Sequence, residues 1–251
     1  MERAITVLRF ASSLDFTGEL PPGARAWEVA ERILAEASGR PVRTISKPVW
    51  PNAKLPAILE RWIDEFEPDI VLICISSYWV ETEVVANRIR RLGILGRRLE
   101  SASQAAAMKP GVADSPLYLL GRRVLLRTVG GRPNFTPAEL AANVESWLRV
   151  ILRRESVAVA IAGTPFSPDT MATKPAQHRA SRRKDELRAR LGELGKRLGI
   201  VVEMPPHAPD AFDPALRLPD RVHFNEKAHA RMGEIDGRAL VATWERSQGE
   251  R

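Results

Sequence analysis

The stretch Ile70–Ile75, with the sequence IVLICI, decides the fold class of this 251-residue chain. All six residues are apolar, and Pro68 and Asp69 introduce them. A strand that is apolar at every position is buried on both faces, as the central strands of parallel sheets are. We therefore predict a buried central strand over residues 70–75.

Strand-like and helix-like segments alternate on both sides of this stretch. The predicted strands cover residues 5–10, 42–45, 70–75, 157–162 and 200–203, and the predicted helices cover residues 27–38, 56–66, 83–92, 97–108, 137–154, 180–198 and 226–245. Strands that alternate with helices are typical of α/β proteins with a parallel sheet. Ligands of such sheets bind at the carboxyl ends of the strands, so we expect the functional residues in the loops that follow the strands.

The composition excludes several classes of protein. Hydrophobic residues make up 44% and charged residues 27% of the chain, which is typical of a soluble globular protein. Cys74 is the single cysteine, so neither an intrachain disulfide nor a cysteine-based zinc cluster can form. No apolar run reaches the roughly 20 residues that span a bilayer. We expect a cytoplasmic protein with a reduced thiol, no membrane association and no metal or organic cofactor.

The basic residues are spread along the chain, and one cluster of them stands out. The chain has 38 Lys and Arg against 31 Asp and Glu, a net charge of +7. The cluster consists of Arg179, Arg182, Arg183, Lys184, Arg188 and Arg190. Asp185 and Glu186 interrupt it, and no aromatic residues are interleaved with it. We interpret it as a solvated helix face and expect no nucleic-acid partner. An anion- or nucleic-acid-binding helix is the alternative.

The familiar glycine-rich motifs are absent. The chain contains neither Gly-x-Gly-x-x-Gly nor Gly-x-x-x-x-Gly-Lys-Ser/Thr, so nothing indicates a nucleotide phosphate cradle. The Gly-x-Ser-x-Gly nucleophile elbow of α/β-hydrolases is missing as well.

Two strand-end segments do carry chemistry. Ser13 follows the first predicted strand, and Asp220 precedes His223 by three residues just before the last predicted helix. In a turn, this spacing lets the carboxylate reach the ring Nδ1–H and leaves Nε2 to accept a proton. A serine hydroxyl within reach of that nitrogen is a usable nucleophile. The alternatives are a loop-capping serine and a structural Asp–His pair.

These segments resemble the SGNH or GDSL hydrolases, a family of esterases, lipases, thioesterases and acetylhydrolases. The Asp-x-x-His block followed by an apolar residue, Asn and a helix is matched by Asp220–Asn225. The strand 70–75 leading into Ser76-Ser77-Tyr78-Trp79, and the segment Val157–Pro165, match further blocks in the family's order. The resemblance implies a three-layer α/β/α sandwich around a five-stranded, flavodoxin-like parallel sheet, in one domain over residues 1–251.

The oxyanion-binding blocks depart from the family pattern. Ala11-Ser12-Ser13-Leu14 stands where the family has Gly-Asp-Ser-Leu. The second block lacks its Gly, leaving Asn52 as a substitute donor or an ordinary turn residue. Tyr78 stands where the third block has its Asn, with Ser76 and Ser77 before it. Losing one oxyanion donor costs about 10²–10³ in turnover, so we expect weak activity.

The resemblance thus implies an ester hydrolase with a Ser13, His223 and Asp220 triad, in which the Ser13 amide and Asn52, Ser76, Ser77 or Tyr78 bind the oxyanion. Its substrate would be a small carboxylic ester. The alternative is a catalytically weak or inactive binding or regulatory protein of the same fold. The resemblance gives out over residues 88–133, which we expect to form a lid over the cleft or an interface between copies.

Overall fold

The computed structural model describes residues 3–11, 16, 19–84, 87, 120, 124, 131–167, 173–218 and 223–249. Almost all of the expected lid or interface segment, 88–133, lies outside these residues, as does the predicted helix 97–108. The described elements are β1 (Ile5–Ala11), α1 (Ala26–Ser38), β2 (Val42–Pro48), α2 (Leu55–Phe66), β3 (Ile70–Ile75), α3 (Ser77–Val80), α7 (Pro137–Ile151), β4 (Ala158–Gly163), α8 (Lys174–Leu198), β5 (Val201–Glu203), the 3₁₀ turn η3 (Pro214–Leu216) and α9 (Glu226–Gly249).

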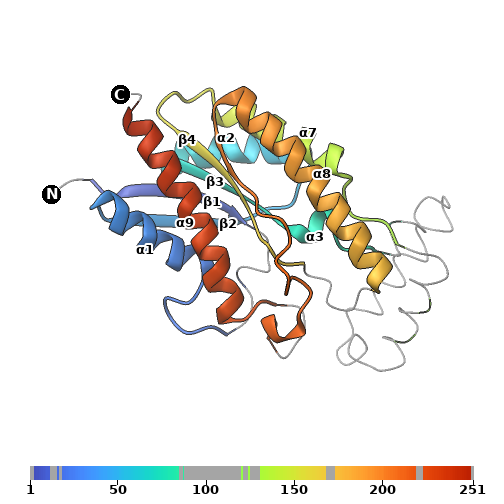
Figure 1. The fold of residues 1–251 in the computed structure, drawn as a ribbon. Coiled ribbons are helices and arrows are strands. Elements are labelled where there is room, and N and C mark those ends of the chain that lie inside the picture. The colour runs from blue at the N-terminus through green and yellow to red at the C-terminus, as the bar shows by residue number, and fades with distance from the viewer. Residues whose placement is uncertain are drawn as a thin grey trace.

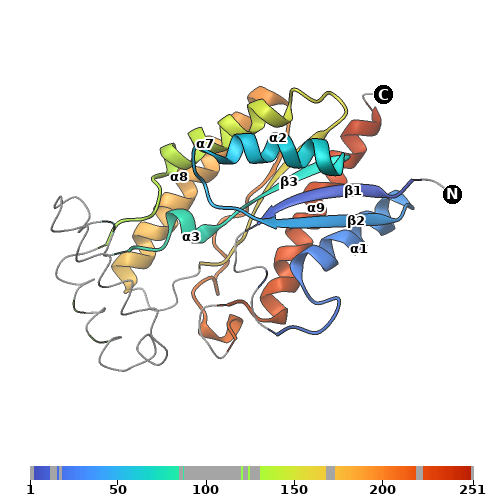
Figure 2. The same ribbon diagram turned by 180° about the vertical axis from the view of Figure 1, so that it is seen from behind.

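The sheet has the strand order β2-β1-β3-β4-β5, and every pairing in it is parallel. Helices α1 and α9 cover one face, and α2, α7 and α8 cover the other (Figures 1 and 2). The predicted three-layer α/β/α sandwich with a five-stranded parallel sheet is therefore confirmed. β3 lies between β1 and β4 and is buried along its whole length, as its unbroken apolar sequence predicts.

The face under α2, α7 and α8 is packed with large apolar side chains. Leu8 and Phe10 of β1 alternate with residues of the other face, as the period of a strand requires. Above them, Trp147 of α7 packs edge-on against Trp79, with ring centroids 6.4 Å apart, and both are fully buried. This layer is held together by hydrophobic burial.

The face under α1 and α9 is packed more closely by smaller residues. Val7 and Ala11 of β1 contribute to it. A β-carbon added at Gly233 of α9 would lie 2.5 Å from Cβ of Val29 and 2.7 Å from the carbonyl oxygen of Ala26, both on α1. The absence of a side chain at this position therefore lets the two helices approach each other.

The structure corrects the sequence predictions at several element ends. α8 begins at Lys174 rather than at residue 180, with the extended Thr173 before it and a proline in its first turn. The predicted helix 83–92 does not include Glu83 and Val84, because Val84 pairs with Arg132 in an isolated antiparallel bridge, whereas Asn87 is helical. The short helix α3 stands where the sequence indicated a loop.

The basic cluster of α8 is only partly a solvated face. Arg182, Arg188 and Arg190 are exposed as predicted, but Lys184 is 3% exposed and Arg183 is half-buried. These two residues are buried because this side of α8 packs against acidic residues that follow α3.

No helix in the described parts of the chain is long and apolar enough to cross a membrane.

Candidate active site at the carboxyl edge of the sheet

A small pocket opens where the parallel strands end. β1, β3 and β4 end at this edge, and the segment before α9 passes beside it (Figure 2). The described residues that line it are Arg9, Cys74, Ile75, Ser76, Ser77, Ala162, Gly163, Thr164, Phe224, Met232 and Asp236. Its volume is about 30 Å³, which is enough for one or two water molecules. The pocket lies where ligands bind to sheets of this class.

Two of the three predicted triad residues, Ser13 and Asp220, lie outside the described residues. The third, His223, is half-buried and belongs to the segment that leads into α9. Its carbonyl accepts a hydrogen bond from the Leu218 amide at 2.8 Å. The next residue, Phe224, forms a bridge with Arg217 and lines the pocket. The segment thus holds His223 at the carboxyl edge of the sheet.

Asn225 fixes how this segment enters α9. Its side-chain Nδ2 donates to the carbonyl of Ala215 at 2.7 Å, and its Oδ1 accepts from the amide of Ala228 at 3.1 Å. The second bond caps the first turn of α9, which is the usual role of Asn before a helix. The Asn of the sequence block therefore positions the histidine two residues before it.

The predicted oxyanion residues separate into two groups. Ser76 and Ser77 are buried at the end of β3 and line the pocket. Tyr78 is half-buried and packs against the ring of Trp50, with centroids 6.3 Å apart. Asn52 is exposed, and its side chain closes a turn by donating to the Trp50 carbonyl. The structure brings the two serines beside Phe224 and does not bring Tyr78 or Asn52 to the described pocket lining.

A buried ion pair forms part of the pocket wall, and sequence reasoning did not anticipate it. Nη2 and Nε of Arg9 donate to Oδ2 of Asp236 at 2.8 and 3.1 Å, and both residues are buried. The Cys74 thiol lies 3.5 Å from the same oxygen. The available signal was an arginine inside an apolar strand, because a buried charge needs an opposite charge nearby.

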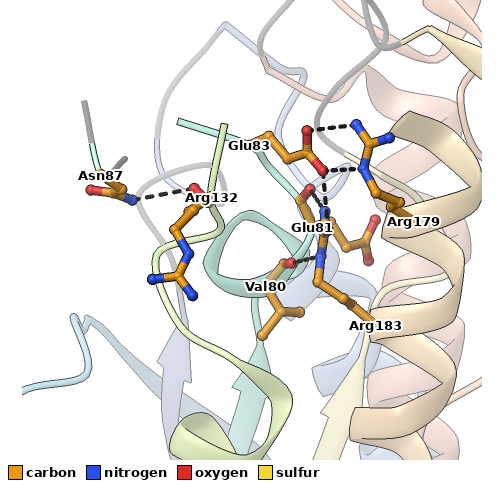
Figure 3. A network of polar contacts seen from close by, with 7 residues as sticks. All are labelled: Val80, Glu81, Glu83, Asn87, Arg132, Arg179 and Arg183. Carbon is orange, nitrogen blue, oxygen red and sulfur yellow. Dashed lines mark hydrogen bonds and ion pairs between the residues drawn. The ribbon is translucent and has the colours of Figure 1, made fainter. Parts of the chain in front are cut away.

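A second polar cluster lies where α3 meets α8 (Figure 3). Arg179 donates two hydrogen bonds to Glu83, and Arg183 donates one to Glu83 and one each to the carbonyls of Val80 and Glu81. Burial alone would raise the pKa of Glu83, but the hydrogen bonds from the two arginines hold this pKa below its usual value. The arginines thus tie the segment that follows α3 to α8.

Lys184 is the most deeply buried cation of this cluster. Its ammonium donates to the carbonyl of Thr164. Burial lowers its pKa to about 8, although the negative charge of Glu81 opposes this effect. Lys184 thus joins the charge network that packs α8 against the segment after α3.

Solved structures of esterases and lipases share this fold. The chain aligns with a family 3 carbohydrate esterase of Clostridium thermocellum at 11% identity, covering 97% of this chain and 98% of the other, with a TM-score of 0.52. A catalytic mutant of an acetylxylan esterase from Geobacillus stearothermophilus aligns at 14% identity, covering 96% of each chain, with a TM-score of 0.52.

A protein of Parabacteroides merdae assigned as a GDSL-like lipase gives 13% identity, coverage of 96% and 97%, and a TM-score of 0.53. No family model matches the sequence, and neither does any curated protein sequence. The resemblance to SGNH and GDSL hydrolases is therefore confirmed as a likeness of fold to divergent chains.

Proposed function

We propose that the chain hydrolyses small carboxylic esters by a serine mechanism at the carboxyl edge of the sheet. Ser13 attacks the acyl carbon, His223 Nε2 takes its proton and later returns it to the leaving alcohol, and Asp220 orients the imidazole. The observation that carries the proposal is the position of His223. Its segment passes beside the pocket into which β3 and β4 lead, and Ser13 follows the end of β1 by two residues.

Ser76 and Ser77 are the strongest described candidates for the oxyanion contacts. Both are buried against the pocket that Phe224, the neighbour of His223, also lines. The Ser13 amide would supply a further donor. Asn52 and Tyr78 reach the oxyanion only if their side chains leave the turn and the ring contact that hold them. This incomplete set of donors favours slow turnover on generic esters.

The names of the structural neighbours support an ester substrate. The proteins from Clostridium thermocellum and Geobacillus stearothermophilus are esterases of carbohydrates, and the protein from Parabacteroides merdae is assigned as a lipase. All three names indicate enzymes that cleave a carboxylic ester bond. We therefore propose carboxylic esters as the substrate class.

Hydrolysis of an alkyl ester, ethyl acetate, followed as acid release in a pH-stat, tests the proposal. The wild-type chain should hydrolyse the ester slowly, and Ser13→Ala and His223→Ala should each lower the turnover by at least about 10²-fold. Ser146→Ala is the matched control, because its hydroxyl already donates to the carbonyl of Asn143 at 2.7 Å and lies on the helix α7. Equal turnover in wild type and Ser13→Ala would refute the assignment.

The alternative is a binding protein that retains the pocket without turnover. The observation that favours it is Asn52, whose amide and carbonyl groups are both engaged in a turn. In this case, the chain would bind a non-hydrolysable ester analogue, yet Ser13→Ala would leave both binding and the background hydrolysis unchanged.

A further inference from the structure

Three side chains from distant parts of the sequence form a continuous hydrogen-bonded row. The hydroxyl of Ser181, on α8, lies 2.9 Å from Nδ1 of His207, in the loop after β5. Nε2 of His207 lies 2.8 Å from Oε2 of Glu81, which follows α3. None of the three belongs to the described lining of the strand-end pocket.

The partners of the imidazole determine where its proton lies. An ionised carboxylate can only accept hydrogen bonds, so the ring proton is on Nε2 and faces Glu81. Nδ1 then carries a lone pair and accepts the hydroxyl proton of Ser181. The edge of the His207 ring also meets Phe212, with centroids 5.2 Å apart. The histidine is therefore held in one orientation by contacts on three sides.

Glu81 lies in the interior beside this ring, and only Oε2 of its carboxylate has a hydrogen-bond partner among the described residues. Its side chain is 1% exposed, and its backbone carbonyl accepts from Nη2 of Arg183 (Figure 3). The ammonium of Lys184 interacts favourably with its charge. A buried carboxylate stabilises the imidazolium that forms when a serine is deprotonated. The side chain of His207 is 10% exposed and Ser181 is half-buried, so the row reaches the surface at its serine end.

We propose that Ser181, His207 and Glu81 form a second nucleophilic site, distinct from the one assigned to Ser13, which reacts with activated acyl esters. A nucleophile, a base within hydrogen-bond reach and a group that orients the base are the parts that such a site needs. In this row the serine faces Nδ1 of the imidazole and the carboxylate faces Nε2. In the site proposed around Ser13, the serine faces Nε2 and the carboxylate faces Nδ1.

The position of Ser181 within α8 defines the substrate class. In the interior of a helix, each backbone N–H bonds to the carbonyl four residues earlier, so the helix offers no amide for an oxyanion at this position. Without that stabilisation, only an acyl donor with a good leaving group reacts. Aryl esters and thioesters meet this requirement, whereas alkyl esters do not.

The proposed reaction has two steps, acylation of Ser181 and hydrolysis of the acyl-serine. Ser181 Oγ forms a bond to the acyl carbon while its proton passes to His207 Nδ1, and the bond to the leaving group breaks as that group takes the proton. Water then attacks the acyl-serine, and its proton passes through His207 Nδ1 back to Ser181 Oγ, which releases the carboxylic acid. Glu81 retains its hydrogen bond to Nε2–H throughout.

Labelling of the whole chain with a fluorophosphonate, followed by Glu-C digestion and tandem mass spectrometry, tests the proposal. Ser181 lies between Glu155 and Glu186 and Ser13 between Glu2 and Glu19, so the two serines fall in separate peptides. We expect label on Ser181 in the wild type and in Ser13→Ala. His207→Asn should slow labelling of Ser181 by at least about 10²-fold, and Glu81→Gln should also slow it.

Ser146 and Ser247 are internal controls, because their hydroxyls donate to backbone carbonyls and should remain unlabelled. A purely structural tie between α3, α8 and the loop after β5 predicts no label on Ser181, and that result would overturn the proposal. Labelling at an unchanged rate in a folded His207→Asn variant would overturn it as well. The first readout needs no substitution within the row, and it is independent of whether Ser13 reacts.

Discussion

On the face of the sheet covered by α1 and α9, the buried cation Arg9 meets the buried anion Asp236 through two hydrogen bonds. On the opposite side, the buried cation Lys184 donates to a carbonyl oxygen, and Glu81 is the leading opposite charge near it. A directly paired charge stays ionised in the interior, whereas a cation held by a neutral acceptor is driven toward its neutral form. The two sites should therefore respond oppositely to substitution.

The largest effect on stability should follow from breaking the ion pair between Arg9 and Asp236. Asp236→Ala leaves the guanidinium of Arg9 buried without its carboxylate, and it should lower the free energy of unfolding by about 3–5 kcal/mol in urea denaturation. The double variant Arg9→Met/Asp236→Leu removes both charges and should recover most of this loss. If Asp236→Ala changed the free energy of unfolding by less than about 1 kcal/mol, the buried ion pair would not have the structural role assigned to it.

Lys184, the cation held by a neutral acceptor, should affect how the stability of the protein depends on pH. The pKa of Lys184 falls from 10.5 in the unfolded chain to about 8 in the folded protein. The folded state therefore binds fewer protons between these values, and stability rises as pH increases from about 8 to 10.5. The rise should be about 3 kcal/mol, since each pKa unit corresponds to about 1.4 kcal/mol.

Lys184→Met should remove this rise and should be more stable than the wild type at pH 7. The two unfolding curves should converge above pH 10.5, where Lys184 is neutral in both states. Lys196→Met is the matched control on the same helix, because the Lys196 side chain is 76% exposed. Its pH profile should follow that of the wild type. A Lys184→Met profile that follows the wild type would instead show that burial of this ammonium has no energetic consequence.

A smaller effect should distinguish a closely packed glycine between α1 and α9 from a glycine of α8 that has open space beside it. Gly233→Ala places a β-carbon against Val29 and the carbonyl of Ala26, which should cost about 1–3 kcal/mol. A β-carbon at Gly192 of α8 would meet nothing within 4 Å, so Gly192→Ala should gain about 0.5–1 kcal/mol. Thermal unfolding of both variants measures the difference, and shifts in the same direction would disprove the packing argument.

The smallest effect should come from Glu83, whose partners are partly solvated. Its pKa in the folded protein lies below the unfolded value of 4.5, so its contribution to stability is complete above pH 4.5 and is lost as pH falls through the folded pKa. Glu83→Gln should cost about 1 kcal/mol at neutral pH. The cost should disappear in strong acid. If the stability difference between the wild type and Glu83→Gln stayed the same at all pH values, the carboxylate of Glu83 would be excluded as its cause.

The sequence predicted the local elements because their signals are local. β3 has the predicted bounds, since an unbroken apolar run with a proline before it can be read without knowledge of any partner. The bounds of α8 were predicted less well, because its first turn is polar and carries no apolar period, and only the proline in that turn marks its start. Val84 pairs with Arg132, a contact that no helical period could indicate.

The candidate active site was predicted in part. The sequence alone placed Ser76 and Ser77 at the end of β3 and His223 before the last helix, and the described structure brings those segments to one pocket. The catalytic roles of Ser13, His223 and Asp220, and the oxyanion role of Ser76 and Ser77, stay predictions. Asn52 was assigned either to a turn or to the oxyanion, and the structure places it in the turn.

The sequence by itself determined the order of strands and helices, the buried central strand and the edge of the sheet at which the candidate site lies. Only the tertiary structure paired Arg9 with Asp236 across 227 positions and His207 with Glu81 across 126. The sequence around His207 contains no partner. Hydrophobic periodicity is encoded within a few residues, whereas a buried polar group is satisfied by whichever distant side chain the packed layers bring to it.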